Sequence, residues 1–147
     1  MSSVNDGILK TTYVETSSLL AAILDEDADA HRELETPARR VTSALTLVEA
    51  RRAVTRERIQ KRIDADQESA LLVALETFTA QCTVSAITTD ILQRAGRRFP
   101  VEPVRTLDAI HLATVESVGI PPHLVRVVTR DRRLRENARA MGYDCPA

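Results

Sequence analysis

The sequence predicts an α/β fold built on a parallel sheet. Runs of β-prone residues alternate with helical patterns along the chain, and no two runs are joined by the turn residues typical of a tight hairpin. Helices that connect parallel strands pack on both faces of their sheet, so we expect three layers, α/β/α. The 147 residues favour one domain, 1–147, which is long enough to bury a core without disulfides or a structural metal.

The N-terminal part of the chain is predicted to form strand, helix, helix, strand and helix. In Ile8–Val14, two apolar residues precede the β-prone run Thr-Thr-Tyr-Val, and the hydroxyls of Thr16–Ser18 can cap the helix that follows. A short second helix is expected after the acidic stretch Asp25–Asp29. Arg40–Ser43 is the second candidate strand, and a long amphipathic helix is expected from about Leu45.

The middle of the chain is predicted to form helix, strand and helix. Asp64 is a capping residue ahead of apolar positions at helical spacing, which continue to Phe78. Thr83–Ile87 alternates in character and predicts a third strand. Thr88–Asp90 then offers caps for a helix that is expected to reach Phe99.

The central element of the prediction is a helix that begins near Thr106 and presents Asp108. Thr106 is expected to cap it, so that Asp108 falls in the first turn, where the helix dipole and free N–H groups stabilise an anion. Gly119 is expected to end the helix. Three apolar residues should bury the side of the helix that presents Asp108 near its rim: Leu107, Ile110 and Ala113.

The C-terminal part of the chain is predicted to form strand, helix and a short edge strand. Arg126–Thr129 is a clear β-prone run, and the helix Arg132–Met141 leads to Gly142 as its C′ residue. Tyr143–Cys145 is expected to add a strand at the edge of the sheet.

Four acidic residues fall where a parallel sheet binds ligands, beyond the carboxyl ends of its strands. Glu15 directly follows the first strand, and Asp131 follows the last clear one. Glu49 and Asp108 come early in helices that begin on the same side. Because such a cluster would repel itself, a divalent cation is expected to hold it together, and ligands that are all oxygen suit Mg²⁺ or Mn²⁺.

These residues also have purely structural interpretations. Glu49 could pair with Arg52 one turn further along its helix, and Asp131 could cap the helix that starts at Arg132. Glu15 is harder to explain in this way, because an acid at the end of a buried strand is exposed only where a site opens. We expect His111, one turn after Asp108, to be a packed helix residue and not a ligand.

The net charge of −1 conceals a segregated pattern of charge. Arginines gather at positions 51, 52, 56 and 58, at 94, 97 and 98, and at 130, 132, 133, 135 and 139. With no Trp, two Phe and two Tyr, the chain lacks the aromatic residues of a base-stacking sheet of the RRM or OB type. Any bound nucleic acid would therefore be held mainly by its phosphates.

The sequence indicates a cytoplasmic protein. No basic region followed by an apolar run occurs at the N-terminus, and no apolar run reaches the roughly eighteen residues of a membrane span. Cys82 and Cys145 are far apart and lack metal-binding spacing, so we expect both to be packing residues in a reducing compartment.

Four segments resemble the acidic motifs of PIN domains, in order and spacing across nearly the whole chain. They are Tyr13–Leu20, Leu47–Arg51, Leu107–Ala113 and Val128–Leu134. Together they are most similar to the VapC toxins of bacterial toxin–antitoxin pairs. The resemblance implies a single PIN-like domain with a mainly parallel sheet of five strands in the order 3-2-1-4-5. It also implies a metal-dependent ribonuclease, frequent homodimers and a VapB-like antitoxin that inserts a segment into the active-site groove.

The expected reaction is endonucleolytic hydrolysis of RNA by a metal-bound water. Asp108 and Glu15 are predicted to hold Mg²⁺ or Mn²⁺, while Asp131 and Glu49 complete the cluster or bind a second ion. Two arginines further along the Glu49 helix are the predicted phosphate contacts, Arg52 and Arg56.

One departure from the family concerns the first acid, which is usually Asp but is Glu15 here. The longer side chain shifts the carboxylate, and Mg²⁺ demands near-ideal octahedral geometry. A PIN-like binding module without metal chemistry is therefore an alternative function. An aspartyl-phosphate phosphatase of the HAD kind would need a second acid two residues after the first, and Ser17 at that position counts against it.

Overall fold

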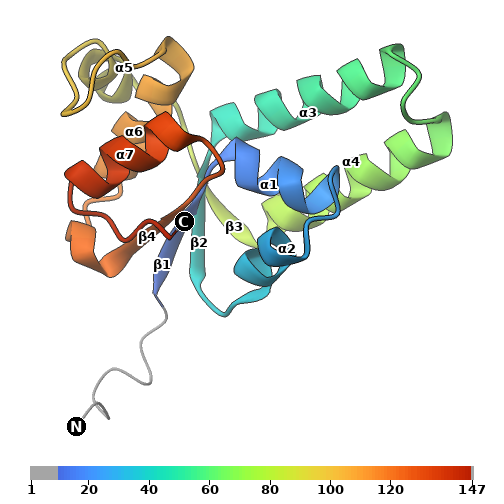
Figure 1. Cartoon of the computed structure of the whole chain (residues 1–147), viewed down its shortest axis with the longest axis horizontal. Coiled ribbons are helices and arrows are strands. Elements are labelled where there is room, and N and C mark those ends of the chain that lie inside the picture. The colour runs from blue at the N-terminus through green and yellow to red at the C-terminus, as the bar shows by residue number, and fades with distance from the viewer. Residues whose placement is uncertain (1–9, 147) are drawn as a thin grey trace, which may run out of the picture.

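The computed structural model describes residues 10–146, in which helices and strands alternate as expected (Figure 1). The strands are β1 (Thr11–Val14), β2 (Arg39–Ser43), β3 (Cys82–Ser85) and β4 (Val125–Val128). The helices are α1 (Thr16–Ile23), α2 (Ala28–Glu35), α3 (Ala44–Ile59), α4 (Ala65–Ala80), α5 (Thr89–Ala95), α6 (Thr106–Ser117) and α7 (Arg132–Ala140), with a 3-10 turn at Pro122–Leu124.

The four strands form one parallel sheet in the order β3-β2-β1-β4. Tyr13 of β1 pairs with Val41 of β2 on one side and with Val127 of β4 on the other. Strand order therefore reverses between β1 and β4, and the carboxyl ends of these two strands flank the point where open α/β sheets bind ligands.

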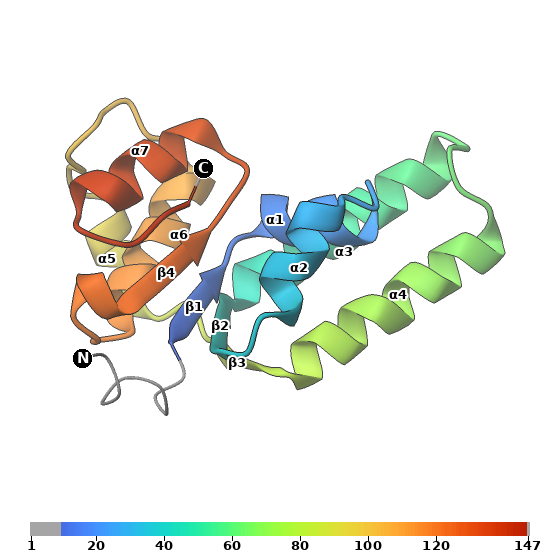
Figure 2. The same cartoon turned by 60° about the horizontal axis from the view of Figure 1, so that its bottom comes forward.

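Two separate apolar cores confirm the three layers. Tyr13 and Val127 belong to a core shared with α6 and α7, whereas Val14 and Val128 belong to a core shared with α1, α3 and α4. Successive residues of a strand point to opposite faces, so adjacent residues of β1 and β4 supply both cores. Figure 2 shows α5–α7 on one side of the sheet and α1–α4 on the other.

The prediction of a fifth strand is wrong: among residues 10–146, no fifth strand joins the sheet. Tyr143–Cys145 lies in the expected place, beside β4, where Asp144 forms an isolated parallel bridge with Arg126. The Asp144 N–H donates to Val125 and its carbonyl accepts from Val127. The ladder stops there because Pro146, which has no N–H, follows within two residues.

Several predicted boundaries also change. The part of the first strand predicted at Ile8 lies outside the described residues, and β1 begins at Thr11. The third strand ends at Ser85 instead of Ile87. α5 ends at Ala95, because Gly96 weakens the helix and Pro100 disfavours helical geometry at the residue before it.

The start of α6 also differs from its prediction. Arg105 is the N-cap residue and makes no side-chain capping bond, so Thr106 is already helical and does not cap. Asp108 still lies in the first turn. Of the three apolar positions predicted to be buried, only Ala113 is: Leu107 is 48% exposed and Ile110 is half-buried, while the buried residues of α6 are Ala109 and residues 111–115.

The helices α3 and α4 pack against each other as a long hairpin that extends away from the sheet (Figures 1 and 2). Asp64 begins α4 with a capping box shared with Gln67, as its cap was predicted. No helix among residues 10–146 is long and apolar enough to cross a membrane.

Candidate active site

All four predicted acids lie at the carboxyl edge of the sheet. Glu15 follows β1 directly, and its N–H donates to the carbonyl of Val128 at the end of β4 (3.1 Å). Asp131 begins α7 after β4, Glu49 lies in the second turn of α3, and Asp108 lies in the first turn of α6. Four different helices therefore start around this edge.

Glu15 is held more tightly than any other acid of this group. Its side chain is the N-cap of α1 and is only 5% exposed. One carboxylate oxygen, Oε2, accepts from the Ser17 N–H (3.0 Å), the Ser17 hydroxyl and the Thr129 hydroxyl (2.8 Å). Hydrogen bonds from several donors satisfy a buried carboxylate and fix its position.

The two hydroxyls that hold Glu15 also join α1 to the turn after β4. The Arg130 N–H donates to the Ser17 hydroxyl oxygen (2.7 Å), and the Asp131 N–H donates to the Thr129 hydroxyl oxygen (3.0 Å). Each hydroxyl thus accepts from this turn and donates to Glu15. The Glu15 and Asp131 positions are consequently linked through two side chains.

Glu49 is bound by a hydroxyl and an imidazole. Its Oε1 accepts from the Thr16 hydroxyl (2.6 Å) and lies 2.6 Å from Nε2 of His111. Burial opposes ionisation of Glu49, but the hydrogen bonds from His111 and Thr16 outweigh it and lower its pKa. Among the described residues Glu49 forms no ion pair with Arg52, so that structural alternative is not supported.

His111 is buried as predicted, but its surroundings are polar. The side chain is 1% exposed, and its Nδ1 lies 2.8 Å from the hydroxyl of Tyr13 in β1. The apolar spacing of α6 gave no indication of these partners, because they come from β1, α1 and α3.

Asp108 lies among the charges of the other acids. Burial and then the negative charges of Asp131, Glu15 and Glu49 raise the pKa of Asp108, while His111 acts in the opposite direction. All three other acids therefore lie within electrostatic range of its carboxylate.

Asp131 has the structural role that was considered for it, as a helix cap. Its Oδ1 accepts from the Leu134 N–H (2.9 Å) and caps α7. A capping acid still has free lone pairs on its second oxygen, so the cap and a role in ligand binding are compatible.

The four acids do not form a preassembled metal site. Among residues 10–146, no three Asp, Glu, His or Cys side chains are grouped so that they could hold one metal ion. The donor chemistry nevertheless fits a hard divalent cation. All four groups offer carboxylate oxygens, and the repulsion that raises the pKa of Asp108 is the kind that a bound cation relieves.

Comparison with known proteins identifies the family. The PIN domain family matches residues 12–140 of the chain. The chain belongs to the PIN domain family. This PIN domain is 32% identical to ribonuclease VapC35 of Mycobacterium tuberculosis over 133 residues, which cover 88% of the chain and 90% of that protein. The relationship confirms the expected enzyme class, a ribonuclease of the VapC type.

Solved structures confirm the PIN fold at lower identity. VapC20 of Mycobacterium tuberculosis matches with a TM-score of 0.63 at 22% identity, covering 90% of this chain and 95% of that one. VapBC from Salmonella typhimurium, bound to DNA, matches with a TM-score of 0.61 at 18% identity, covering 95% and 98%. The four-stranded sheet and its helices are thus arranged as in PIN domains.

Five polar residues around the acids of this PIN domain were missed by sequence reasoning or assigned other roles. They are Tyr13, Thr16, Ser17, His111 and Thr129. Only the hydroxyl-rich run directly after Glu15 carried a signal, and it was interpreted as helix capping. The other contacts join residues that are 62, 98 and 114 positions apart, which no local pattern predicts.

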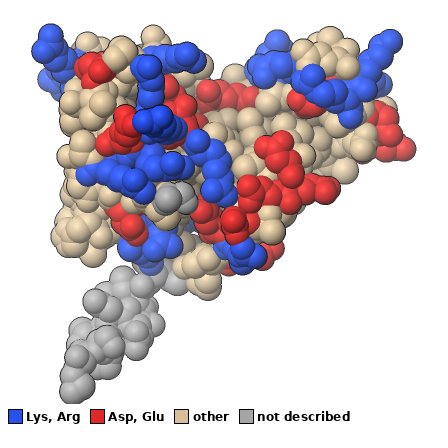
Figure 3. Space-filling model, viewed as in Figure 1, with Lys and Arg blue, Asp and Glu red and all other residues tan. Residues whose placement is uncertain are grey.

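The predicted phosphate contacts lie on the exposed side of α3. Arg52 and Arg56 are both exposed and follow Glu49 by about one and two turns. Figure 3 shows basic side chains gathered over α7 and over the far end of the α3–α4 hairpin, with acidic side chains between them. Basic surfaces therefore lie on two sides of the PIN domain.

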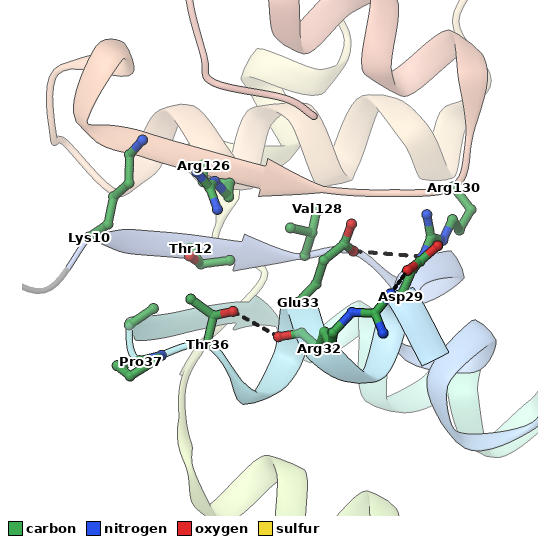
Figure 4. Close-up of a pocket in the computed structure, with 11 residues that line it drawn as sticks. Lys10, Thr12, Asp29, Arg32, Glu33, Thr36, Pro37, Arg126, Val128 and Arg130 are labelled. Carbon is green, nitrogen blue, oxygen red and sulfur yellow. Dashed lines mark hydrogen bonds and ion pairs between the residues drawn. The ribbon is translucent and has the colours of Figure 1, made fainter. Parts of the chain in front are cut away.

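A cleft of about 480 Å³ lies elsewhere, between α2 and strands β1 and β4 (Figure 4). None of the four acids lines it. Its four basic side chains all form ion pairs with nearby acids: Lys10, Arg32, Arg126 and Arg130. This charge-balanced cleft is separate from the candidate active site.

Proposed function

We propose that this PIN domain is a metal-dependent endoribonuclease whose catalytic residues are Glu15, Glu49, Asp108 and Asp131. The observation that supports this most directly is the position of all four acids at the carboxyl edge of the sheet, where burial and then the charges of Asp131, Glu15 and Glu49 raise the pKa of Asp108. Acids from four separate segments are brought to the reversal point of the strand order, where ligands bind in such sheets.

The four carboxylates would hold Mg²⁺ or Mn²⁺, as PIN domain nucleases typically use a divalent metal. When bound, the ion supplies a nucleophilic water near neutral pH and stabilises charge on the phosphate. Glu15 is fixed by Ser17 and Thr129, so it provides a rigid oxygen at the end of β1. Asp108 accepts no side-chain hydrogen bond from residues 10–146, so no such contact fixes the direction of its carboxylate.

RNA phosphates would be bound by Arg52 and Arg56 on α3. Both side chains are exposed and are absent from every ion pair found among residues 10–146. An arginine without a partner can offer its full bidentate fork to a phosphate. These contacts position the substrate and do not read its sequence.

We also propose that the protein is the toxin of a pair with a VapB-like antitoxin and that it forms homodimers. The likeness to the VapBC complex of Salmonella typhimurium supports an antitoxin. The edge strand β3 exposes Val84, and Ile87 just beyond it is also exposed, which gives an apolar surface suited to a second copy. Light scattering of the purified chain would measure its oligomeric state.

The decisive experiment compares the wild type with Asp108→Asn on labelled RNA, with Mg²⁺, with Mn²⁺ and with neither. Asn is nearly isosteric and uncharged, so cleavage should fall below about one hundredth of the wild-type rate while the fold is retained. Wild-type cleavage by the variant would refute the assignment. A wild type that is inert with both metals would instead support a binding module.

A further inference from the structure

A buried chain of side chains leads from the core to Glu49. It begins at Tyr13, which is fully buried in β1, continues through His111 of α6, and ends at Glu49 of α3. Thr16 at the start of α1 closes the group, because its hydroxyl donates to Glu49 and lies 3.3 Å from Nε2 of His111. Four elements therefore meet in one hydrogen-bonded cluster.

The direction of these hydrogen bonds follows from chemistry. An ionised carboxylate only accepts, so Nε2 of His111 must bear the hydrogen that points to Glu49. A tyrosine phenol ordinarily keeps its proton near neutral pH, and the hydroxyl of the fully buried Tyr13 lies 2.8 Å from Nδ1 of His111. Its hydroxyl can then donate to Nδ1, which leaves Nε2–H for Glu49.

We propose that His111 is a positioning residue: its imidazole, fixed by the Tyr13 hydroxyl, holds the Glu49 carboxylate at the acid cluster. Glu49 is 25% exposed while His111 is 1% exposed, and among residues 10–146 the one acid of the site to which His111 is hydrogen-bonded is Glu49. This inference rests on the proposed role of Glu49. Partners of this kind orient the ligands of metal sites and change metal affinity by about 10–100-fold when they are replaced.

The geometry explains why a histidine suits this position. The imidazole spans the distance between a phenol in the core and a carboxylate at the edge, with one nitrogen for each. The rings of Tyr13 and His111 also pack edge to face, with centroids 6.1 Å apart at 75°. The ring can therefore neither rotate nor slide without losing a contact.

The test uses three variants at this cluster and one matched control. His111→Asn ends near the position of Nδ1 and leaves Glu49 without its donor, whereas His111→Gln carries an N–H near the position of Nε2. Tyr13→Phe removes only the hydroxyl. The control is Thr46→Val, which removes a fully buried hydroxyl from the same helix as Glu49, one that has no hydrogen-bond partner among residues 10–146.

The first readout is Mn²⁺ binding by calorimetry without RNA, with thermal unfolding as a check of folding. We expect His111→Asn to weaken Mn²⁺ binding by about 10–100-fold, His111→Gln to recover most of this loss, and Tyr13→Phe to fall between them. The Thr46→Val control should bind as the wild type does. Cleavage of RNA should lose kcat in the same order, with KM unchanged, because no phosphate contact is altered.

A double-substitution cycle separates positioning from a general structural effect. In a Glu49→Gln background, His111→Asn should weaken Mn²⁺ binding no further. An equal loss in both backgrounds would overturn the proposal, because the effect would then not pass through Glu49. Unchanged Mn²⁺ binding by folded His111→Asn and Tyr13→Phe would overturn it as well.

Failure of the proposed function gives a different result in the same experiment. If Glu49→Gln alone bound Mn²⁺ and cleaved RNA as the wild type does, Glu49 would not belong to the site. If Glu49→Gln lost both while the His111 variants kept both, only the positioning role would be refuted.

Discussion

Asp108 differs from the three acids around it in how its charge is accommodated. Hydrogen bonds satisfy the carboxylates of Glu15, Glu49 and Asp131, whereas no residue between 10 and 146 donates one to Asp108. Its pKa is raised by burial and by its acidic neighbours. The charge that a cation would relieve most is therefore the one on Asp108.

The metal-free protein should be destabilised by the ionised form of Asp108. A raised folded-state pKa means that ionisation opposes folding at pH values above the unfolded-state pKa, and that this penalty vanishes below it. In metal-free buffer at neutral pH, Asp108→Asn should therefore unfold at a urea concentration at least as high as the wild type. The advantage should shrink as the pH falls from about 7 to about 3.

Asp144 provides a control of opposite sign for this urea experiment. The hydrogen bond from Lys10, helped by Arg126 and opposed by burial, lowers the pKa of Asp144. The stability it contributes is present above the unfolded-state pKa and is lost as the pH falls through the folded-state value. Asp144→Asn should thus lower stability at pH 7. If Asp108→Asn did the same, the crowding of acids would be disproved.

Glu15 tests whether the site depends on its longer side chain. Glu15→Gln should remove most cleavage, because the amide carries no charge. Glu15→Asp should retain more activity, since Asp is also a good N-cap, but it should cleave more slowly than the wild type because the shorter arm loses the 2.8 Å contact with Thr129. Mn²⁺ should restore Glu15→Asp better than Mg²⁺ does, because Mg²⁺ demands near-ideal geometry. Equal cleavage by Glu15→Gln and wild type would leave three acids in the site.

At the scale of elements, three of the four acids lie at helix N-termini. Glu15 caps α1, Asp131 caps α7, and Asp108 lies in the first turn of α6. The free N–H groups and the positive end of each helix dipole stabilise these anions while no cation is bound. The position of the acids at helix N-termini therefore both stabilises the starts of the helices and brings the acids together.

Asp131 allows capping and charge to be separated. Asp131→Asn keeps an oxygen for the Leu134 N–H, so its free energy of unfolding should stay near that of the wild type while cleavage is lost. Asp131→Ala should lose cleavage and also about 1 kcal/mol of stability. Urea unfolding and RNA cleavage measure the two effects. If Asp131→Asn cleaved RNA as fast as the wild type, helix capping would be the only role left for Asp131.

The arginines of α3 should act on substrate binding and not on chemistry. Arg52→Ala and Arg56→Ala should each raise KM several-fold with little change in kcat. Each should also reduce the slope of log KM against log salt by about 0.7–1, the value expected for one phosphate contact. Arg32→Ala is the control, because Arg32 is exposed on α2 and paired with Asp29. If both variants kept the wild-type slope of log KM against log salt, the RNA phosphates would be bound at other residues.

The sequence was sufficient for features that depend on local chemistry. The helix cap at Asp64, the C′ glycines Gly119 and Gly142 with positive φ, and the alternation of strands and helices all follow from neighbouring residues. A Cβ at Gly142 would also lie 3.4 Å from Pro122. The position of the acids at the carboxyl edge of the sheet could be predicted because the strands were expected to be parallel.

What could not be predicted depends on contacts between distant segments. Tyr13 and His111 are 98 residues apart, and Thr129 and Glu15 are 114 apart. Because a hydroxyl after an acid suits both a helix cap and a carboxylate partner, its role is decided only when β1 and β4 pair. The fifth strand failed for a similar reason, since a single bridge to β4 depends on how the chain leaves α7.

At the scale of the whole molecule, acidic side chains lie between two basic surfaces (Figure 3), and the four acids of the candidate site gather at the carboxyl edge of the sheet. A proposed antitoxin would be expected to bring a basic side chain, most suitably Arg, to this region, because Arg binds carboxylates with two hydrogen bonds. A cation and the antitoxin would then compete for the same oxygens.

The proposed antitoxin should therefore bind more weakly as salt or Mn²⁺ rises. Affinity can be measured by calorimetry across salt and metal concentrations, with the product of a small open reading frame beside this protein's gene as the candidate antitoxin. Asp108→Asn should weaken binding and reduce its dependence on Mn²⁺, while Arg32→Ala, on α2, should change neither. An affinity independent of salt and metal would indicate a purely apolar groove.

The position of β1 in the centre of the sheet has a consequence for synthesis. Its pairing with β4 joins Thr11 to Val125, so the neighbour on that side is made more than a hundred residues later. A ribosome that releases the chain from its N-terminus first can fold β1 with β2 and β3 early, but Asp131 and the Thr129 hydroxyl are added last. The proposed site, which takes Asp131 and the Thr129 hydroxyl from this later part of the chain, is therefore completed only after β4 and the start of α7 have been synthesised.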